Sequence, residues 1–246
     1  MKIFKYLSIF IKSFTYRKIS YSYGGIDSLI LNIFKNKKKG FYVDIGCGHP
    51  IKNNNTYLLN KKGWKGINID LDEGNIDLFN IYRINDENII SAVTDEKKEV
   101  DLYFYHSKSA INTISKKTAD YQKAKVSSVK KINSNTLNEI LKNSKFKNFQ
   151  IDFLTIDVEG SELLVFKGAE NVLKDSQPII FCEMLRMHAK KFNFHPNETI
   201  LLLDGYGYKC FSRNINNSFE EIKEMTDETE ETNYFFLHRT KHLAQI

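Results

Sequence analysis

Two acidic residues and a glycine-rich turn near the start of the chain have the spacing of a nucleoside-binding site. An apolar run that begins at Phe41 leads into Asp44-Ile45-Gly46-Cys47-Gly48, and the next such segment ends at Asp70. Glycine has no Cβ, so this turn lets the backbone approach a ligand closely. A carboxylate at the end of the neighbouring strand can accept hydrogen bonds from both hydroxyls of a ribose. The spacing therefore predicts a ligand that contains adenosine.

The residues of the turn favour S-adenosylmethionine over a nicotinamide dinucleotide. A dinucleotide site requires a third glycine for the helix that cradles the pyrophosphate, and this chain has Ile51 there. Pro50 lies in the same turn and has no N–H to offer an anion. S-adenosylmethionine carries no phosphate, so a looser turn that holds a ribose and an amino-acid tail is sufficient. The predicted cofactor is S-adenosylmethionine, with a nicotinamide cofactor as the alternative.

Three further carboxylates are candidates for catalysis. Asp157 and Glu159 lie two residues apart where the buried run 151–158 ends, so a continued strand would turn both to the same side. Glu183 ends the next buried run. Open α/β sheets bind ligands at the carboxyl ends of their strands, so these side chains are expected to gather beside the ligand. Capping of the following helix is the structural alternative for Glu159 and Glu162.

Methyl transfer to a hydroxyl needs alignment of the acceptor and a base. Asp157 is the predicted indispensable residue, and Glu159, Glu183 and His49 are the further candidates for the base. His49 qualifies because the unperturbed pKa of histidine is about 6.5, which keeps it mostly neutral at cytosolic pH. The carboxylates could instead hold Mg²⁺, which prefers hard oxygen ligands. Nothing in their spacing requires a metal, so no metal site is predicted.

Strand-like and helix-like segments alternate along the chain, which places these residues at one edge of a sheet. Seven strands are expected, at 41–45, 66–70, 89–93, 151–158, 178–183, 208–211 and 234–237. An alternating stretch at 100–105 is expected to be half exposed, and the acidic stretch 217–232 is expected to be a surface loop. The pattern predicts a doubly wound, Rossmann-like α/β sheet that is mostly parallel, with an antiparallel last strand.

The chain is expected to consist of an N-terminal helix at 1–19 and a single catalytic domain at 20–246. Six apolar residues of the helix share one face, from which Lys5 and Lys12 are absent: Ile3, Phe4, Leu7, Phe10, Ile11 and Phe14. Such a helix packs on its own domain, joins a second subunit of a homo-oligomer, or makes a peripheral membrane contact. Within the domain, the polar stretch 106–130 is either a cover over the substrate or a plain surface loop.

Composition favours a cytoplasmic enzyme. The 246 residues, of which 41% are hydrophobic, suffice for a full core. The three cysteines form no Cys-x-x-Cys pair, so neither a zinc site nor a disulfide framework is indicated. The net charge of +6 forms no basic stripe with interleaved aromatic residues, so nucleic acid is not an expected partner. Lysines interrupt the apolar residues at the amino terminus, so neither a signal peptide nor a membrane span is expected.

Taken together, the motifs resemble the FkbM-type methyltransferases. The resemblance rests on the segment 40–46, the turn through Asn55-Thr56, the segment 63–70 and above all Asp157-Val158-Glu159-Gly160-Ser161-Glu162. It extends over roughly residues 20–237. The glycine turn departs from the family, which often has Ala-Asn after the first glycine where this chain has Cys47-Gly48-His49-Pro50.

The resemblance implies a class I S-adenosylmethionine-dependent methyltransferase, and many members of the family O-methylate sugars or polyketides. The expected acceptor is a sugar or a surface-glycan precursor. The alternatives are a carboxylate, phosphate or lipid-linked acceptor, or a catalytically silent cofactor-binding subunit that docks a partner. The predicted catalytic residues are Asp157, Glu159, His49 and Glu183, and the predicted cofactor-binding residues are Asp44, Gly46, Gly48, Thr56, Asp70 and Ala92.

Overall fold

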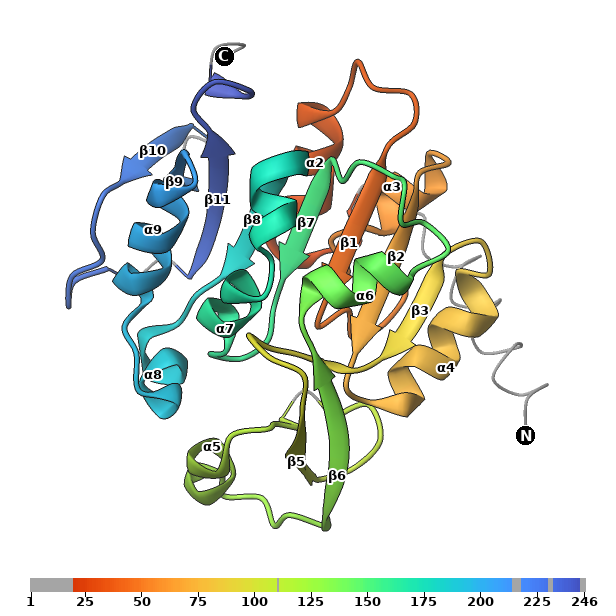
Figure 1. The fold of residues 1–246 in the computed structure, drawn as a ribbon, viewed down its shortest axis with the longest axis vertical. Coiled ribbons are helices and arrows are strands. Elements are labelled where there is room, and N and C mark those ends of the chain that lie inside the picture. Colours follow the sequence, from red (N-terminus) through yellow and green to blue (C-terminus); the bar gives the residue numbers. More distant parts are fainter. Residues whose placement is uncertain (1–19, 110, 214–217, 230–231, 244–246) are drawn as a thin grey trace.

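The computed structural model describes residues 20–109, 111–213, 218–229 and 232–243, so the helix predicted for 1–19 lies outside the described residues. An eight-stranded sheet forms the centre of the molecule (Figure 1). Its strands are β1 (Phe41–Ile45), β2 (Lys65–Asp70), β3 (Glu87–Ile90), β7 (Phe153–Ile156), β8 (Ile179–Glu183), β9 (Tyr208–Arg213), β10 (Phe219–Ile222) and β11 (Asn233–His238). They are arranged in the order β10-β9-β11-β8-β7-β1-β2-β3.

The strands β3, β2, β1, β7 and β8 are parallel, and β11 runs antiparallel between β8 and β9. The chain moves outward from β1 through β2 to β3 and then continues on the other side with β7. Ligands bind at such a switch point in doubly wound sheets. Ile45 pairs with both Ile69 and Ile156, so Gly46, Asp70 and Asp157 follow at the same level of the sheet. The predicted doubly wound sheet with an antiparallel last strand is confirmed.

The prediction of a plain loop over 217–232 was wrong, because β10 adds an eighth strand there. It pairs antiparallel with β9, whose edge would otherwise leave backbone groups unpaired. The Phe219 ring packs edge-on against Phe235, with 5.2 Å between the ring centroids. One aromatic anchor therefore holds a strand whose sequence is otherwise acidic.

A small second sheet extends below the carboxyl edge of the large sheet in Figure 1. It consists of β4 (Ala92–Val93), β5 (Lys98–Phe104) and β6 (Ser128–Asn135). The strand predicted at 89–93 is divided, because β3 ends at Ile90 and β4 pairs with β6 instead. The predicted half-exposed stretch 100–105 belongs to β5. The sequence did not predict β6, because its residues are polar and most of them are solvent-accessible.

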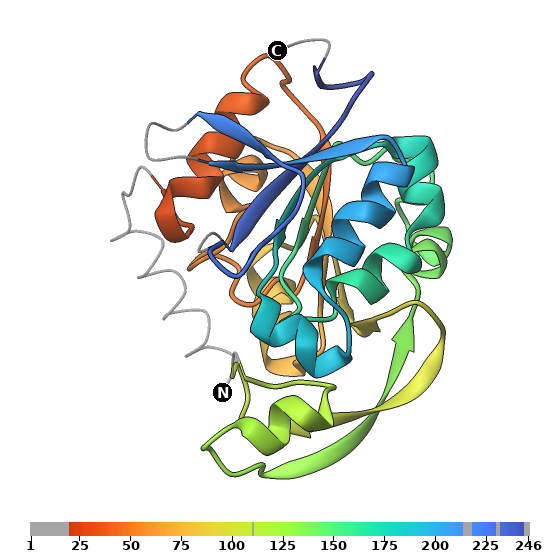
Figure 2. The ribbon, with the colours of Figure 1, turned by 90° about the vertical axis from the view of Figure 1, so that its left-hand side faces the viewer.

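Helices cover both faces of the large sheet, with α2 on one face and α7 and α9 on the other (Figure 2). The helices are α2 (Ile26–Ile33), α3 (Tyr57–Lys61), α4 (Glu73–Tyr82), α5 (Lys116–Tyr121), α6 (Leu137–Asn143), α7 (Glu162–Lys167), α8 (Arg186–Ala189) and α9 (Pro196–Gly205), with short turns η1 (Tyr23–Gly25), η2 (Val172–Ser176) and η3 (Lys190–Phe192). None of the helices in the described part of the chain has the length and apolar character to cross a membrane.

Two of the apolar cores in the described part of the chain lie between these layers, and β1 contributes to both. Val43 and Ile45 join the core beneath α6, α7 and α9, while Tyr42 joins the core beneath α2 and α3. All five residues of β1 are buried, which is typical of a central parallel strand covered on both faces. The central strands are therefore rigid supports for the residues that follow them.

Candidate active site

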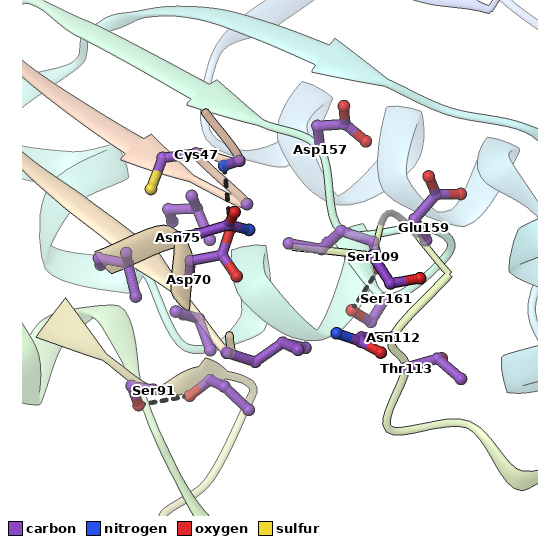
Figure 3. A pocket seen from close by; sticks show the side chains of 18 of the residues that line it. Cys47, Asp70, Asn75, Ser91, Ser109, Asn112, Thr113, Asp157, Glu159 and Ser161 are labelled. Atoms are coloured by element: carbon purple, nitrogen blue, oxygen red, sulfur yellow. Dashed lines mark hydrogen bonds between the residues drawn. The ribbon is translucent and has the colours of Figure 1, made fainter. Parts of the chain in front are cut away.

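A cavity of about 450 Å³ opens where β1, β2 and β7 end (Figure 3). Its walls come from the glycine turn after β1, the residues after β2 and β3, the segments 108–109 and 112–114 and the turn after β7. Seven predicted site residues line it: Gly46, Gly48, His49, Asp70, Ala92, Asp157 and Glu159. Asp44, Thr56 and Glu183 are not among its lining residues.

The glycine turn is held tightly between β2 and β7. Gly46 has a φ of 76°, and a Cβ there would lie 1.8 Å from the carbonyl oxygen of Asp157. Its N–H donates to the carbonyl of Ile69 at 2.9 Å. Gly48 also has a positive φ, and its N–H donates to Oδ2 of Asp70 at 2.9 Å. Only glycine fits at position 46, because the backbones of β1 and β7 meet there.

Asp70 is buried at the floor of the cavity and organises the loops around it. Besides the Gly48 N–H, its carboxylate accepts the Asp72 N–H at 2.8 Å and the Asn75 side-chain amide at 3.1 Å. Burial raises the pKa of Asp70 to about 6, and these hydrogen bonds oppose the rise. A carboxylate has about four lone-pair sites, so Oδ1 retains one for a ligand hydroxyl.

Asp44 and Thr56 lie behind the glycine turn rather than on the cavity wall. Oδ2 of Asp44 accepts the Thr56 hydroxyl at 2.8 Å and the Asn54 amide at 3.2 Å. Burial raises the pKa of Asp44 to about 6. The structure thus brings Asp44 and Thr56 together in a network that supports the turn, and their predicted direct contact with the cofactor stays a prediction.

A buried arginine, which the sequence did not single out, completes this network. Arg83 is 1% exposed and donates to the carbonyl of Pro50 at 2.8 Å and to Oδ1 of Asn54 at 2.7 Å. It also donates to the Tyr42 hydroxyl, which in turn donates to Asp86. A buried charge is destabilising unless it is paired and hydrogen-bonded, so these contacts compensate one another. Arg83 thereby fixes the loop that follows the glycine turn.

The turn after β7 differs from the geometry that the sequence predicted. A continued strand was expected to turn Asp157 and Glu159 to the same side, but β7 ends at Ile156 and Glu159 has a φ of 57°. This left-handed turn still brings the two side chains together. Asp157, Glu159 and Glu183 offer carboxylate oxygens that lie within 4.8 Å of one another. Carboxylates at this separation can share a proton or hold a hard cation.

Gly160 and Glu162, which follow Glu159 in the chain, have structural roles. A Cβ on Gly160 would lie 2.5 Å from the backbone carbonyl carbon of His188, so glycine permits the close packing of α8. Glu162 is buried and accepts the Gly160 N–H at 2.8 Å, and burial raises its pKa to about 7. Glu162, the first residue of α7, therefore stabilises the turn that precedes this helix.

The carboxyl groups of Asp157 and Glu183 lie close together, and each affects the pKa of the other. Asp157 is exposed to the solvent of the cavity. Desolvation, and next the charge of Glu183, raise the pKa of Asp157 well above its usual range. Burial also raises the pKa of Glu183, which the hydrogen bond from Asp157 and the charge of His188 oppose. Within the pair, these directions favour a proton on Asp157 rather than on Glu183.

His49 and His188 lie on different sides of the site. Nδ1 of His49 accepts the N–H groups of Ile51 and Lys52, both at 3.1 Å. In the neutral ring, Nε2 therefore carries the proton, so the imidazole has no free acceptor nitrogen. Nδ1 of His188 lies 2.7 Å from Oε2 of Glu159, although the two groups are not aligned for a hydrogen bond. This geometry favours the carboxylates over His49 as the base.

A doubly wound sheet with a glycine turn after β1 and an acid at the end of β2 defines a Rossmann-like fold. The sequence matches the family model of the methyltransferase FkbM domain over residues 44–210. The chain therefore belongs to the FkbM methyltransferase family, which confirms the resemblance drawn from its motifs.

Several solved structures are similar to this chain, among them the following three. The methyltransferase FkbM from Methylobacillus flagellatus has a TM-score of 0.48 at 14% identity, with 80% of this chain and 44% of that chain covered. The chain thus spans less than half the length of that protein. A TehB-like SAM-dependent methyltransferase from Corynebacterium glutamicum has a TM-score of 0.45 at 11% identity, with 95% and 96% covered. The precorrin 8W decarboxylase from Methanobacterium thermoautotrophicum has a TM-score of 0.43 at 13% identity, with 86% and 88% covered. No curated protein sequence matches the chain.

Proposed function

We propose that the chain is an S-adenosylmethionine-dependent O-methyltransferase. The observation that carries this proposal is a single cavity with Asp70 and the glycine turn on one wall and Asp157 and Glu159 on another. Its volume of about 450 Å³ falls in the usual range for small-molecule sites, about 300–1,000 Å³. One cavity therefore offers room for the nucleoside of the donor beside groups that can activate an acceptor.

The donor half of the cavity fits an adenosine without phosphates. Oδ1 of Asp70 is available to a ribose hydroxyl, and the apolar residues Leu71, Ala92 and Val93 line the part of the cavity beside it. The glycine turn would hold the amino-acid tail of S-adenosylmethionine. The turn has Ile51 where a dinucleotide site requires its third glycine, and Pro50 offers no N–H to a pyrophosphate, which argues against a nicotinamide cofactor.

The acceptor half is arranged to bind a hydroxyl group and remove its proton. When bound, S-adenosylmethionine supplies a methyl group on a sulfonium, so the protein has to align the acceptor oxygen and take its proton. A proton on Asp157 would let this residue donate a hydrogen bond that orients the acceptor. Glu159, which is partly solvent-accessible and lies beside His188, can accept the proton on its carboxylate. Asp157 is then a binding and orienting group, and Glu159 is the base.

The charge of this wall supports a neutral acceptor that carries hydroxyl groups. Three neighbouring carboxyl groups accept hydrogen bonds from hydroxyls, whereas they repel a carboxylate or phosphate acceptor. We therefore propose a sugar or a glycan precursor as the acceptor, in agreement with the family. The cytoplasmic location, the absence of a nucleic-acid partner and the membrane or subunit contact of residues 1–19 stay predictions.

Binding and transfer can be tested separately. Calorimetric titration with S-adenosylhomocysteine tests the donor site without an acceptor, and NAD serves as the matched control ligand. Incubation of sugar and glycan precursors with methyl-labelled S-adenosylmethionine, followed by mass spectrometry, then identifies the acceptor. Label that appears only on carboxylates or phosphates would contradict the proposed acceptor class.

A further inference from the structure

We propose that Asp72 and Asn112 are positioning residues that hold the segments 106–109 and 111–114, here called the donor wall, over the nucleoside half of the cavity. The proposal rests on the proposed function, because it takes the ligand of that half to be S-adenosylmethionine. It assigns this part of the predicted substrate cover to the donor rather than to the acceptor.

One buried carboxylate joins three parts of the chain. Asp72 follows Asp70 by two residues, is 3% exposed and caps α4, with its Oδ1 accepting the Gly74 N–H at 2.7 Å. Its Oδ2 accepts the Lys108 N–H at 2.6 Å and the Asn112 side-chain amide at 2.7 Å. The residue that sets the start of α4 therefore also fixes the donor wall beside the end of β2.

Asn112 is the matching residue on the donor wall. It is 7% exposed, and its Oδ1 accepts the Tyr105 N–H at 2.9 Å. Its Nδ2 donates both to Asp72 and, at 3.0 Å, to the carbonyl of His106. An amide can donate to a carboxylate and accept from the backbone at once, which an aspartate at this position could not do.

The donor wall also packs closely against α4. A Cβ on Gly74 would lie 1.9 Å from Oγ of Ser107, so a side chain at position 74 would force Ser107 to move. Figure 3 shows Ser109, Asn112 and Thr113 on the wall that faces Asp70, and all three line the cavity. Asp70 and the donor wall thus enclose the nucleoside half of the cavity from two sides.

The rest of the predicted cover lies elsewhere. The helix α5, which follows the donor wall, contacts the turn η3 beyond α8: Lys117 hydrogen-bonds Asn193, and Nζ of Lys191 lies 5.2 Å from the Tyr121 ring. The donor wall is therefore attached through Asp72 to the end of β2, while α5 is attached to η3, which follows β8 on the acceptor side of the cavity. Because the donor wall is held before the ligand binds, less ordering is required on binding, and donor affinity rises.

The test compares S-adenosylhomocysteine binding by the full chain and its Asn112→Asp variant, using calorimetry and stopped-flow dissociation. This change removes the amide donor and places a second carboxylate beside Asp72, which should weaken binding at least tenfold through faster dissociation. The double variant Asp72→Asn with Asn112→Asp restores one donor and should recover part of the loss. The control is Asn197→Asp, because Asn197 ties a loop away from the cavity through two hydrogen bonds with Met225. It should lower the melting temperature without changing the affinity.

Hydrogen exchange of the wild-type chain gives a second measurement that needs no variant. Saturating S-adenosylhomocysteine should slow exchange in peptides from 105–114 and leave those from α5 unchanged. Unchanged exchange in 105–114, or wild-type affinity in a folded Asn112→Asp variant, would overturn the assignment while leaving the proposed function intact. A wild-type chain that does not bind S-adenosylhomocysteine would overturn both.

Discussion

Replacement of Asp70 by asparagine should weaken binding of the donor while leaving the stability of the fold nearly unchanged. The carboxylate accepts three hydrogen bonds from the protein and has one lone pair left on Oδ1. Asparagine keeps the size of the side chain but loses the charge and gains an N–H₂ group. That group would face donors, either the Gly48 N–H or the Asp72 N–H, so the loop beside the ribose shifts.

The size of the effect follows from these contacts. A hydrogen bond to a charged group contributes about 1.5–3 kcal/mol, which corresponds to a dissociation constant roughly 10- to 150-fold weaker. The free energy of unfolding should increase or stay nearly the same, although donor binding becomes weaker. Burial raises the pKa of Asp70 to about 6, and a rise of about 2 units above the usual aspartate value costs the ionised form about 3 kcal/mol at neutral pH. Removal of the charge offsets the three weakened hydrogen bonds.

Calorimetry with S-adenosylhomocysteine and chemical denaturation of the same preparations give the two quantities. Asp70→Asn should bind at least tenfold more weakly and unfold at a similar denaturant concentration. A matched control is Asp77→Asn, which removes an acid from α4 outside the cavity lining. Unchanged affinity in a folded Asp70→Asn variant would refute the placement of the ribose at Asp70.

Three other predictions concern the charged groups. Asp44 and Asp70 hold their protons more tightly when folded, so stability falls as the pH rises from the unfolded pKa of about 4 through the folded values of about 6, which denaturation at pH 5 and pH 7.5 measures. Arg83→Met leaves Asp86 buried without its cation and should reduce the free energy of unfolding by about 3–5 kcal/mol, measured by urea titration. Once an acceptor is known, Glu159→Gln should lower kcat about 10²–10⁴-fold, and Asp157→Asn, which still offers a donor, should lower it less, with unchanged S-adenosylhomocysteine binding in both.

Local backbone requirements made the glycine turn and the acid at the end of β2 predictable from the sequence. Gly46 and Gly48 have positive φ values, and Asp70 ends a buried strand, so each residue's type reflects its own position. The doubly wound sheet was predictable for the same reason, because its strands are short apolar runs. The partly polar β6 and the acidic β10 were missed, since only pairing with a neighbouring strand makes them strands.

Contacts between distant residues could not be predicted. Arg83 hydrogen-bonds Pro50, 33 residues earlier, and Asn112 hydrogen-bonds Asp72, 40 residues earlier. Nothing in a single sequence indicates that residues at these separations are in contact. Glu159 was singled out correctly as a neighbour of Asp157, but the strand geometry used for it was wrong because the chain turns left-handed there.

Calorimetric titration of the wild-type chain with S-adenosylhomocysteine and with NAD tests the proposed function most directly. The cavity beside Asp70 predicts saturable one-to-one binding of S-adenosylhomocysteine and none of NAD. Tight binding of NAD without binding of S-adenosylhomocysteine would contradict the assignment of the donor, and with it the proposed methyl transfer.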